Sequence, residues 1–174
     1  MKTFKPLLIY SPLIIALDHL TKYLIVQHIG LNDKIVVIPN FFDLVFVFNK
    51  GAAFGIFANL PDGSREILFY IISAIALAML IHFYRKSPMG KHALRTPIAF
   101  ILGGALGNMI DRFFRGAVVD FLSFHWYNKI ADFRLLGAHF RIELTWPAFN
   151  VADIAISCGV VWLIWRMYRL EKAK

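Results

Sequence analysis

The chain has 174 residues, of which 59% are apolar and 17% charged, with a formal net charge of +8. Soluble domains are about 45–50% apolar and about 25% charged, and a chain this short cannot bury so much apolar surface in a soluble globule. The composition also excludes a disordered chain and a coiled coil, and the single cysteine excludes an internal disulfide.

Four apolar segments are each long enough to cross a bilayer, which takes roughly 20 mostly apolar residues. The first resembles a signal peptide, but no small-residue cleavage site follows it, so we expect an uncleaved anchor. The predicted spans cover residues 7–29, 67–84, 96–114 and 149–168. The sequence therefore predicts an α-helical membrane protein, a four-transmembrane-helix bundle in a single domain over residues 1–174.

The segments between the spans differ in character. Residues 30–65 contain two β-prone runs, at 35–38 and 44–48, which predict a small extracytoplasmic β element or hairpin. Residues 115–148 are long and mixed, and we expect an extended outer loop whose aromatic side chains lie at the level of the lipid headgroups.

Basic residues mark one side of the predicted bundle. Ten of the 19 Lys and Arg residues flank the span ends on this side, together with one acid, Glu171. The positive-inside rule then places both termini and the connection between the second and third spans in the cytoplasm. A nucleic-acid-binding protein would gather its bases on one folded face, so topology accounts for the charge without nucleic acid.

Polar residues inside the spans need a reason, because each ionisable group costs roughly 2.5–3.5 kcal/mol on insertion scales. Asp18 and Lys22 are four residues apart on one helix face and can pair. That pair either serves the function or only lowers its own insertion cost, and both interpretations stay open. Gly103 and Gly107 have the GxxxG spacing that lets another helix approach closely, which favours a packing role.

A second polar group gathers near the outer end of the bundle. Asn108 and Arg112 share one face of the third span, and Asn150 and Asp153 share one face of the fourth. Asp120 follows the outer end of the third span, so topology brings it to the depth of Asp153, 33 residues later.

The two carboxylates of Asp120 and Asp153 suggest a chemistry. Two acids in a half-dry site share one proton. The charged acid can then accept a proton from water while the neutral one donates to a carbonyl oxygen, as in an aspartic protease. The same acids can instead bind a cation, serve a small proton- or cation-coupled transporter, or balance Arg112, whose charge is permanent. Asp111 is a further candidate partner for that arginine.

Other chemistries fit less well. A metal hydrolase built from His125, His139 and the two acids is conceivable, but no two of these residues have the ligand spacing of a helix. The sequence contains no GxSxG, HExxH, P-loop or GxGxxG motif. Cys158 lies in the middle of an apolar span, where a thiol usually serves packing.

The same polar residues fall in blocks that resemble those of the lipoprotein signal peptidases, the type II signal peptidases of bacteria. Four blocks occur in the family's order and cover nearly the whole chain. They are DHLTK at 18–22, NKGAAFG at 49–55, GGALGNMIDR at 103–112 with GAVVDF at 116–121, and FNVAD at 149–153.

The resemblance implies an aspartic endopeptidase that removes the signal peptide from diacylglyceryl-modified prolipoproteins, cleaving before the lipidated Cys. It implies Asp120 and Asp153 as the catalytic dyad. The residues it implies for substrate binding or support are Asn49, Asn108, Arg112, Asn150, Ala152, Asp18, Lys22, Gly103 and Asp111. It implies no metal and no organic cofactor. It also implies a multi-pass enzyme of the bacterial cytoplasmic (inner) membrane, active at the extracytoplasmic face, for which a monomer suffices.

The chain departs from the family pattern in two places. His19 stands where many members carry Gln, and we expect no change of chemistry from it. The stretch between Asp120 and Asn150 is about ten residues longer than the pattern, around 128–145, an excursion that surface loops tolerate at little cost. This stretch either alters substrate entry or is a solvated excursion; we favour the excursion, and both interpretations leave the dyad unchanged.

Overall fold

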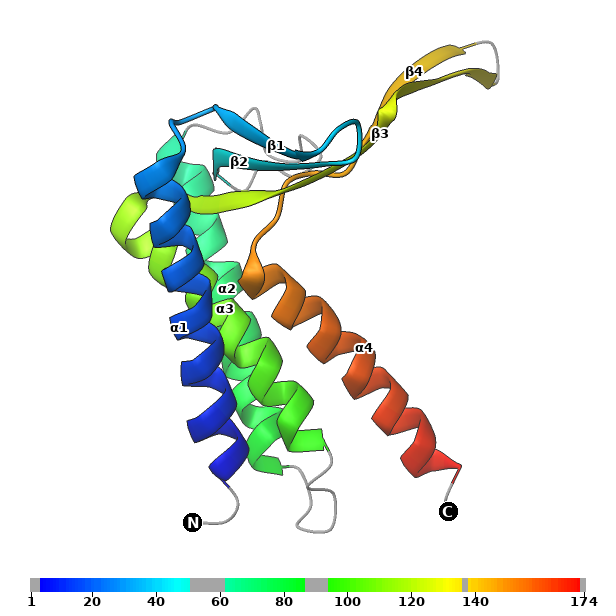
Figure 1. Cartoon of the computed structure of the whole chain (residues 1–174). Coiled ribbons are helices and arrows are strands. Elements are labelled where there is room, and N and C mark those ends of the chain that lie inside the picture. Colours follow the sequence, from blue (N-terminus) through cyan, green and yellow to red (C-terminus); the bar gives the residue numbers. More distant parts are fainter. Residues whose placement is uncertain (1–3, 51–61, 87–93, 136–137, 173–174) are drawn as a thin grey trace.

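The computed structural model describes residues 4–50, 62–86, 94–135 and 138–172. They form four long helices beneath an antiparallel sheet of four strands (Figure 1). The helices are α1 (Lys5–His28), α2 (Asp62–Lys86), α3 (Arg95–Arg115) and α4 (Val151–Glu171). The strands are β1 (Lys34–Ile38), β2 (Phe42–Asn49), β3 (Val118–Leu135) and β4 (Ala138–Thr145).

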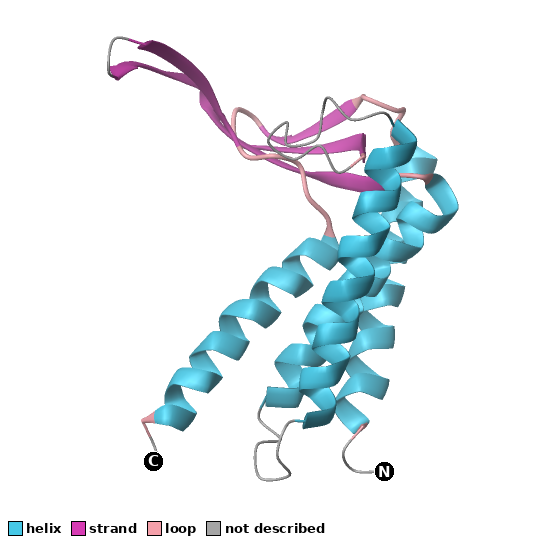
Figure 2. Ribbon diagram, turned by 180° about the vertical axis from the view of Figure 1, so that it is seen from behind, coloured by secondary structure: helices cyan, strands magenta, loops and turns pink. Residues whose placement is uncertain are grey.

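The helices stand side by side with the sheet across one end, whereas the start of α1 and the end of α4 lie at the opposite end (Figures 1 and 2). Each predicted span coincides with one of these helices to within a few residues. Within the described ranges, α1 and α4 are the two helices that are long and apolar enough to cross a membrane. The count of four membrane-crossing helices therefore stays a prediction.

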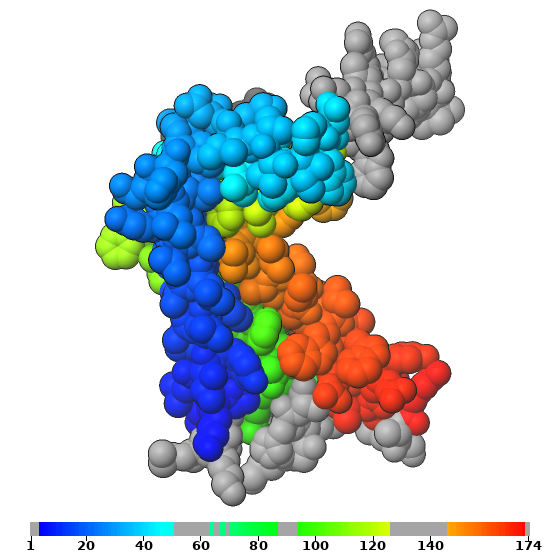
Figure 3. Space-filling model, in the orientation of Figure 1, coloured from blue at the N-terminus to red at the C-terminus, as the bar shows by residue number. Residues whose placement is uncertain are grey.

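The central helix is α3, which packs against α1, α2 and α4. Two glycines let α1 come close, as their GxxxG spacing predicted. A Cβ atom added to Gly103 would lie 3.0 Å from the Cα atom of Ser11, and one added to Gly107 would lie 2.9 Å from Oδ2 of Asp18. The hydroxyl of Ser11 donates to the carbonyl of Ala99 at 2.8 Å across the same interface. In the space-filling view, α1 and α4 flank a strip of α3 beneath the sheet (Figure 3).

The outer surfaces of α1 and α4 are apolar. Leu8 is 69% exposed on α1, and Val161 and Ile164 on α4 are 68% and 62% exposed. Soluble monomers rarely expose continuous apolar surface of this extent. These faces therefore suit contact with lipid tails.

The sheet contains the hairpin that the sequence predicted, formed by β1 and β2. Residues 51–61, which belong to the predicted β element and include most of the NKGAAFG block, lie outside the described residues. Residues 62–65, also predicted as part of that element, begin α2 instead. The extended loop expected over residues 115–148 is wrong in part, because β3 and β4 occupy most of that segment. Pairing of β3 with β2 satisfies backbone groups that a loop would leave to water. Because the paired strands are far apart in the sequence, no local sequence pattern predicts this pairing.

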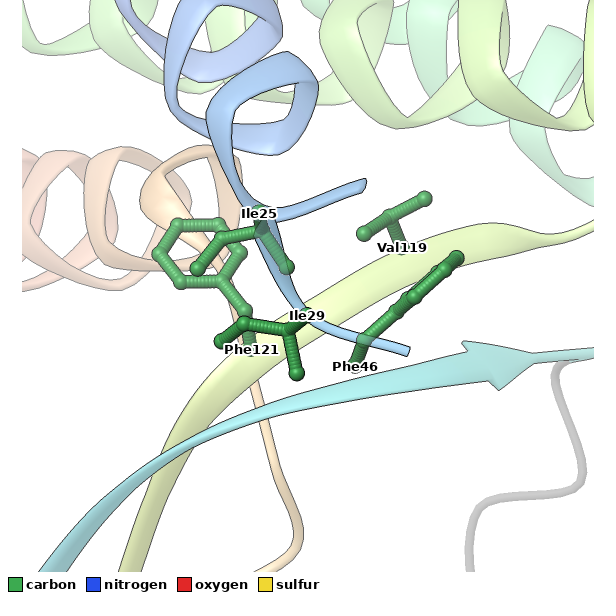
Figure 4. Packing of buried hydrophobic residues seen from close by; sticks show 5 residues of the cluster. All are labelled: Ile25, Ile29, Phe46, Val119 and Phe121. Atoms are coloured by element: carbon green, nitrogen blue, oxygen red, sulfur yellow. The ribbon is translucent and has the colours of Figure 1, made fainter. Parts of the chain in front are cut away.

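The sheet is fastened to the helices by a small apolar core. Ile25 and Ile29 at the end of α1 pack with Phe46 of β2 and with Val119 and Phe121 of β3 (Figure 4). All five side chains are buried, and full burial of a side chain of this size contributes about 1.5–3 kcal/mol. This core fixes the start of β3, which carries Asp120, over the end of the helices.

Candidate active site

The structure brings Asp120 and Asp153 together through one residue, Asn150, which is fully buried. The side-chain Nδ2 of Asn150 donates to Oδ1 of Asp120 at 2.7 Å, and its backbone N–H donates to Oδ2 of Asp153 at 3.2 Å. Asp120 lies in β3 and Asp153 in the first turn of α4. Asp120 from the strand and Asp153 from the helix therefore accept hydrogen bonds from the same residue, Asn150.

The position of Asp153 follows from local sequence. Asn150 caps α4, since its Oδ1 accepts the backbone N–H of Asp153 at 3.0 Å while the Asp153 carboxylate accepts the N–H of Asn150. This reciprocal capping box satisfies two backbone donors at the helix start. The N-terminal end of a helix also favours a negative charge. The FNVAD block thus fixes the position of the Asp153 carboxylate at the start of α4.

The amide of Asn108 on α3 connects Asp153 to a buried cation. Its Nδ2 donates to Oδ1 of Asp153 at 2.8 Å. Its Oδ1 accepts from Nζ of Lys22 at 3.0 Å and from Nδ2 of Asn150 at 3.1 Å. The ammonium group of Lys22 can only donate hydrogen bonds, so the side-chain oxygen of Asn108 must face Lys22. The NH₂ group of Asn108 then faces Asp153.

Lys22 is itself held by two buried carboxylates. Its Nζ lies 2.7 Å from Oδ2 of Asp18, the pair predicted from their spacing, and 2.8 Å from Oδ2 of Asp111. All three side chains are at most 1% exposed. The other oxygen of Asp18 accepts the backbone N–H of Ala152 at 2.9 Å, so α1 also holds the first turn of α4.

Asp111 extends this network to β3. Its Oδ2 accepts the backbone N–H of Val119 at 3.3 Å, one residue before Asp120. Its Oδ1 accepts from Nη1 of Arg115 at 2.8 Å, and Nδ1 of His19 lies 3.9 Å away from the same oxygen. Asp111 thus pairs with Lys22 and Arg115, and its hydrogen bond to Val119 positions the strand that carries Asp120.

Asn49 and Arg112 complete the surroundings of the two acids. Asn49 at the end of β2 donates from Nδ2 to Oδ2 of Asp120 at 2.9 Å. Arg112 interacts electrostatically with Asp153 and Asp120. The hydroxyl of Tyr70 on α2 donates to the backbone carbonyl of Arg112 at 2.7 Å.

Two neighbours of the site were missed and one predicted member lies apart. Gly103 packs against α1 at Ser11, away from the acids, so its role is packing. Gly104 is the residue at which α3 meets the first turn of α4, because an added Cβ atom there would collide with the carbonyl of Ala152. Tyr70 also escaped prediction. Its only signal in the sequence is a phenol in the uncharged second span.

Burial raises the pKa of Asp120 from an ordinary value of 3.8 to about 6. The hydrogen bond from Asn49 opposes this shift, the negative charge of Asp153 adds to it, and the hydrogen bond from Asn150 and the charge of Lys22 oppose it. A carboxyl group with such a pKa exchanges its proton near neutral pH, which is what an acid–base group requires.

Of the two histidines in the metal-hydrolase alternative, His125 contacts another acid, and the side chain of His139 lies outside the described part of the structure. Nε2 of His125 lies 3.9 Å from Oδ2 of Asp43 on the neighbouring strand. In the parts of the chain that the structure describes, no group of three His, Cys, Asp or Glu side chains is arranged to hold a metal ion. What the described site offers is two carboxylates held by amide donors.

Asp120 and Asp153 both accept hydrogen bonds from the buried Asn150, and Asp120 has a raised pKa. Such a pair of carboxylates is the catalytic arrangement of an aspartic peptidase. Here the pair lies at the end of helices whose outer surfaces suit contact with lipid. Comparison with known proteins agrees with this class. The family model described as signal peptidase (SPase) II matches residues 10–169. The chain is 44% identical to the lipoprotein signal peptidase of Syntrophotalea carbinolica over 166 residues, 95% of this chain and 92% of that one.

Further relatives support the same assignment. The lipoprotein signal peptidase of Francisella tularensis subsp. novicida is 41% identical over 167 residues, 94% of each chain. A solved structure described as a bacterial membrane enzyme at 1.9 Å resolution matches with a TM-score of 0.71 and 31% identity, covering 92% of this chain and 91% of that one. The chain belongs to the signal peptidase II family and is an aspartic endopeptidase of the membrane. These relatives give no support to a transporter.

Proposed function

We propose that the chain removes the signal peptide from diacylglyceryl-modified prolipoproteins, cleaving the bond before the lipidated Cys, with Asp120 and Asp153 as its catalytic dyad. Its relatives carry the name lipoprotein signal peptidase, which supports the substrate class. The observation that supports the assignment of the dyad is the buried residue Asn150, whose side-chain amide donates to Asp120 and whose backbone N–H donates to Asp153.

The roles of the two acids follow from their surroundings. Asp153, in the first turn of α4, is the partner carboxylate and acts as the base. Asp120 is the acid that holds a proton more readily, because its pKa is raised to about 6. The substrate carbonyl therefore accepts its hydrogen bond from protonated Asp120, while water gives up a proton to ionised Asp153.

The proton transfers then balance over two steps. In the first, the water oxygen bonds to the carbonyl carbon, Asp153 receives the water proton, and Asp120 passes its proton to the carbonyl oxygen. In the second, the C–N bond breaks as Asp153 donates to the leaving nitrogen, and Asp120 recovers a proton from the tetrahedral intermediate. Both acids return to their starting states, so no cofactor is consumed. Exclusion of water strengthens each of these interactions.

The supporting residues keep the dyad in place during these steps. Asn49 and Asn150 hold Asp120 through its two oxygens. Asn108 orients Asp153, and Lys22 orients Asn108. Arg112, which interacts with both acids, offsets their combined negative charge and contributes to positioning the peptide.

The membrane arrangement belongs to the same proposal. The four helices cross the inner membrane with both termini in the cytoplasm, and the sheet and dyad face the extracytoplasmic side. The bias of basic residues toward the termini supports this orientation. The dyad and its supporting residues all come from one chain, so a monomer carries a complete site.

The test is a cleavage assay with purified protein in lipid bilayers. Two synthetic prolipoprotein peptides of one sequence are compared, one with a diacylglyceryl group on the Cys and one with the free thiol, and the products are identified by mass spectrometry. We expect a product that begins at the lipidated Cys and little cleavage of the free thiol peptide. Equal cleavage of both peptides, or cleavage at another bond, would contradict the proposed substrate class.

A further inference from the structure

The end of α4 that lies opposite the sheet carries basic and aromatic side chains to which the proposed chemistry assigns no role. The last turns of α4 diverge from the other helices (Figures 1 and 2). We give the name basic cluster to five residues of these turns, namely Trp165, Arg166, Tyr168, Arg169 and Lys172. Arg166 is partly buried and the other four members are exposed. The cluster is therefore accessible to a ligand from outside the helix bundle.

Aromatic rings hold the cations of the basic cluster in place. The guanidinium carbon of Arg166 lies 5.2 Å from the centre of the Trp165 ring, and that of Arg169 lies 5.8 Å from the same centre. Further along the helix, Nζ of Lys172 lies 4.8 Å from the centre of the Tyr168 ring. A cation within about 6 Å of a ring centre is attracted to the face of that ring. Two guanidinium groups beside one indole ring are thus positioned in advance for a shared anionic ligand.

The cations of the cluster are not neutralised by acids of the chain. Among the residues that the structure describes, no carboxylate pairs with Arg166, Arg169 or Lys172, and Glu171 between them is exposed. Only the Nε atom of Arg166 is buried without a hydrogen-bond partner, so its two Nη groups are accessible. Guanidinium groups match the oxygens of a phosphate group in charge and in geometry. Phosphate is therefore the ligand chemistry that these donors suit.

The exposed face of α4 continues from the cluster into the apolar part of the helix. Ile154 and Val161 are 42% and 68% exposed. Together with Trp165, Tyr168 and Lys172 they follow one another at intervals of seven, four, three and four residues, which places all five on one helix face. Along this face the hydrocarbon side chains come first, the aromatic rings next and the cation last. A phospholipid has the same chemical order from its acyl chains to its phosphate.

We propose that the basic cluster binds the phosphate group of an anionic phospholipid in the inner leaflet, with the acyl chains along the exposed apolar face of α4. Anionic lipid attracts Lys and Arg beside a membrane-crossing helix, and amphipathic aromatic rings lie at the headgroup level. The net negative headgroup favours this occupant over phosphatidylcholine, whose headgroup brings a cation of its own toward Arg166 and Arg169. The inference rests on the membrane orientation proposed above and is independent of the dyad.

Native mass spectrometry of the full-length protein in a neutral detergent tests the proposal, because it counts bound lipids without any need for cleavage. The protein is titrated with phosphatidylglycerol, with phosphatidylcholine of the same acyl chains, and with inorganic phosphate. The cluster variant carries Arg166→Gln and Arg169→Gln. The matched control carries Arg85→Gln and Lys86→Gln, which removes the same charge from exposed positions in the last turn of α2. Melting temperatures without added lipid verify that both variants are folded.

We expect the wild type and the α2 control to bind phosphatidylglycerol more tightly than phosphatidylcholine. The cluster variant should bind phosphatidylglycerol roughly 30-fold more weakly, because each basic residue beside an anionic lipid strengthens binding about fivefold. Equal binding of the two lipids by the wild type would overturn the proposal. So would an equal loss in both variants, which indicates a general effect of surface charge, or binding of inorganic phosphate as tight as that of phosphatidylglycerol, which indicates a site for a free anion.

Discussion

Replacement of Lys22 by Met is the most informative single change in the polar network. Methionine keeps the length of the side chain and removes the charge from between Asp18 and Asp111, which are 0% and 1% exposed. Loss of one partner from a buried ion pair typically costs about 3–5 kcal/mol, because a charge is left buried and uncompensated. Asp111 keeps Arg115 as a partner at 2.8 Å, whereas Asp18 keeps the N–H of Ala152. We therefore expect Asp18 to account for most of the destabilisation.

The same change removes the charged donor to Asn108. A hydrogen bond to a charged group contributes about 1.5–3 kcal/mol. If that energy serves to aim the Asn108 amide at Asp153, its loss lowers kcat by roughly 10- to 100-fold, since 1.4 kcal/mol corresponds to a factor of ten. Lys22 is 0% exposed and cannot touch substrate, so KM should change little.

A paired variant separates these two effects. In Asp18→Asn with Lys22→Met, the unpaired carboxylate is gone, and the amide oxygen introduced at position 18 still accepts the N–H of Ala152. Thermal unfolding followed by tryptophan fluorescence should show lower stability for the single variant and partial recovery for the double variant, whereas kcat stays low in both. Recovery of kcat together with stability would refute the positioning of Asn108 by Lys22. An unchanged melting temperature for Lys22→Met would refute the buried-charge argument.

Three further predictions concern the neighbours of the dyad. The pKa of Asp120 is about 6 in the folded protein and 3.8 as its ordinary value, so folding takes up a proton between these pH values. The free energy of unfolding of the wild type, relative to that of the Asp120→Asn variant, should therefore rise as the pH falls from 8 to 4, by up to about 3 kcal/mol. A pH-independent difference between the two proteins would contradict this. In cleavage assays, kcat should decline as the pH rises through the pKa of the protonated acid. The Asn49→Ala variant should move this decline to higher pH, because Asn49 stabilises the charged form of Asp120. An unchanged decline, with the rise of kcat on the acidic side moved to higher pH instead, would argue that Asp120 acts as the base. Gly104→Val should separate α3 from α4 at Ala152 and abolish activity with a lower melting temperature, whereas Gly63→Val at an open position of α2 is the matched control.

The sequence predicts those parts of the fold that depend on local pattern. The apolar runs predict the four helices, and the β-branched and aromatic runs on either side of residues 39–41 predict the first hairpin. The spacing of Asp18 and Lys22 predicts their pair, because residues four apart on a helix are neighbours. The predicted topology places Asp120 and Asp153 at one level, and in the structure both acids accept hydrogen bonds from Asn150.

Contacts that arise only in the assembled fold escape such prediction. Asp111 as the second partner of Lys22 depends on the approach of α1 to α3, which no spacing specifies. The pairing of β3 with β2 joins strands about 70 residues apart, so its energy is invisible in any short window. Gly104 looks like its neighbour Gly103 in the sequence, and only the structure shows that one faces α4 and the other α1.

Asp120 and Asp153 are proposed to perform the cleavage together. The direct measurement is kcat for a diacylglyceryl-modified prolipoprotein peptide with Asp120→Asn, Asp153→Asn and Asp43→Asn, the last being a control at a buried acid of the same sheet that pairs with Lys34. Acid–base groups contribute about 10²–10⁴-fold each, so each dyad variant should lose at least that factor while Asp43→Asn keeps its kcat. Wild-type kcat in either dyad variant would contradict the account.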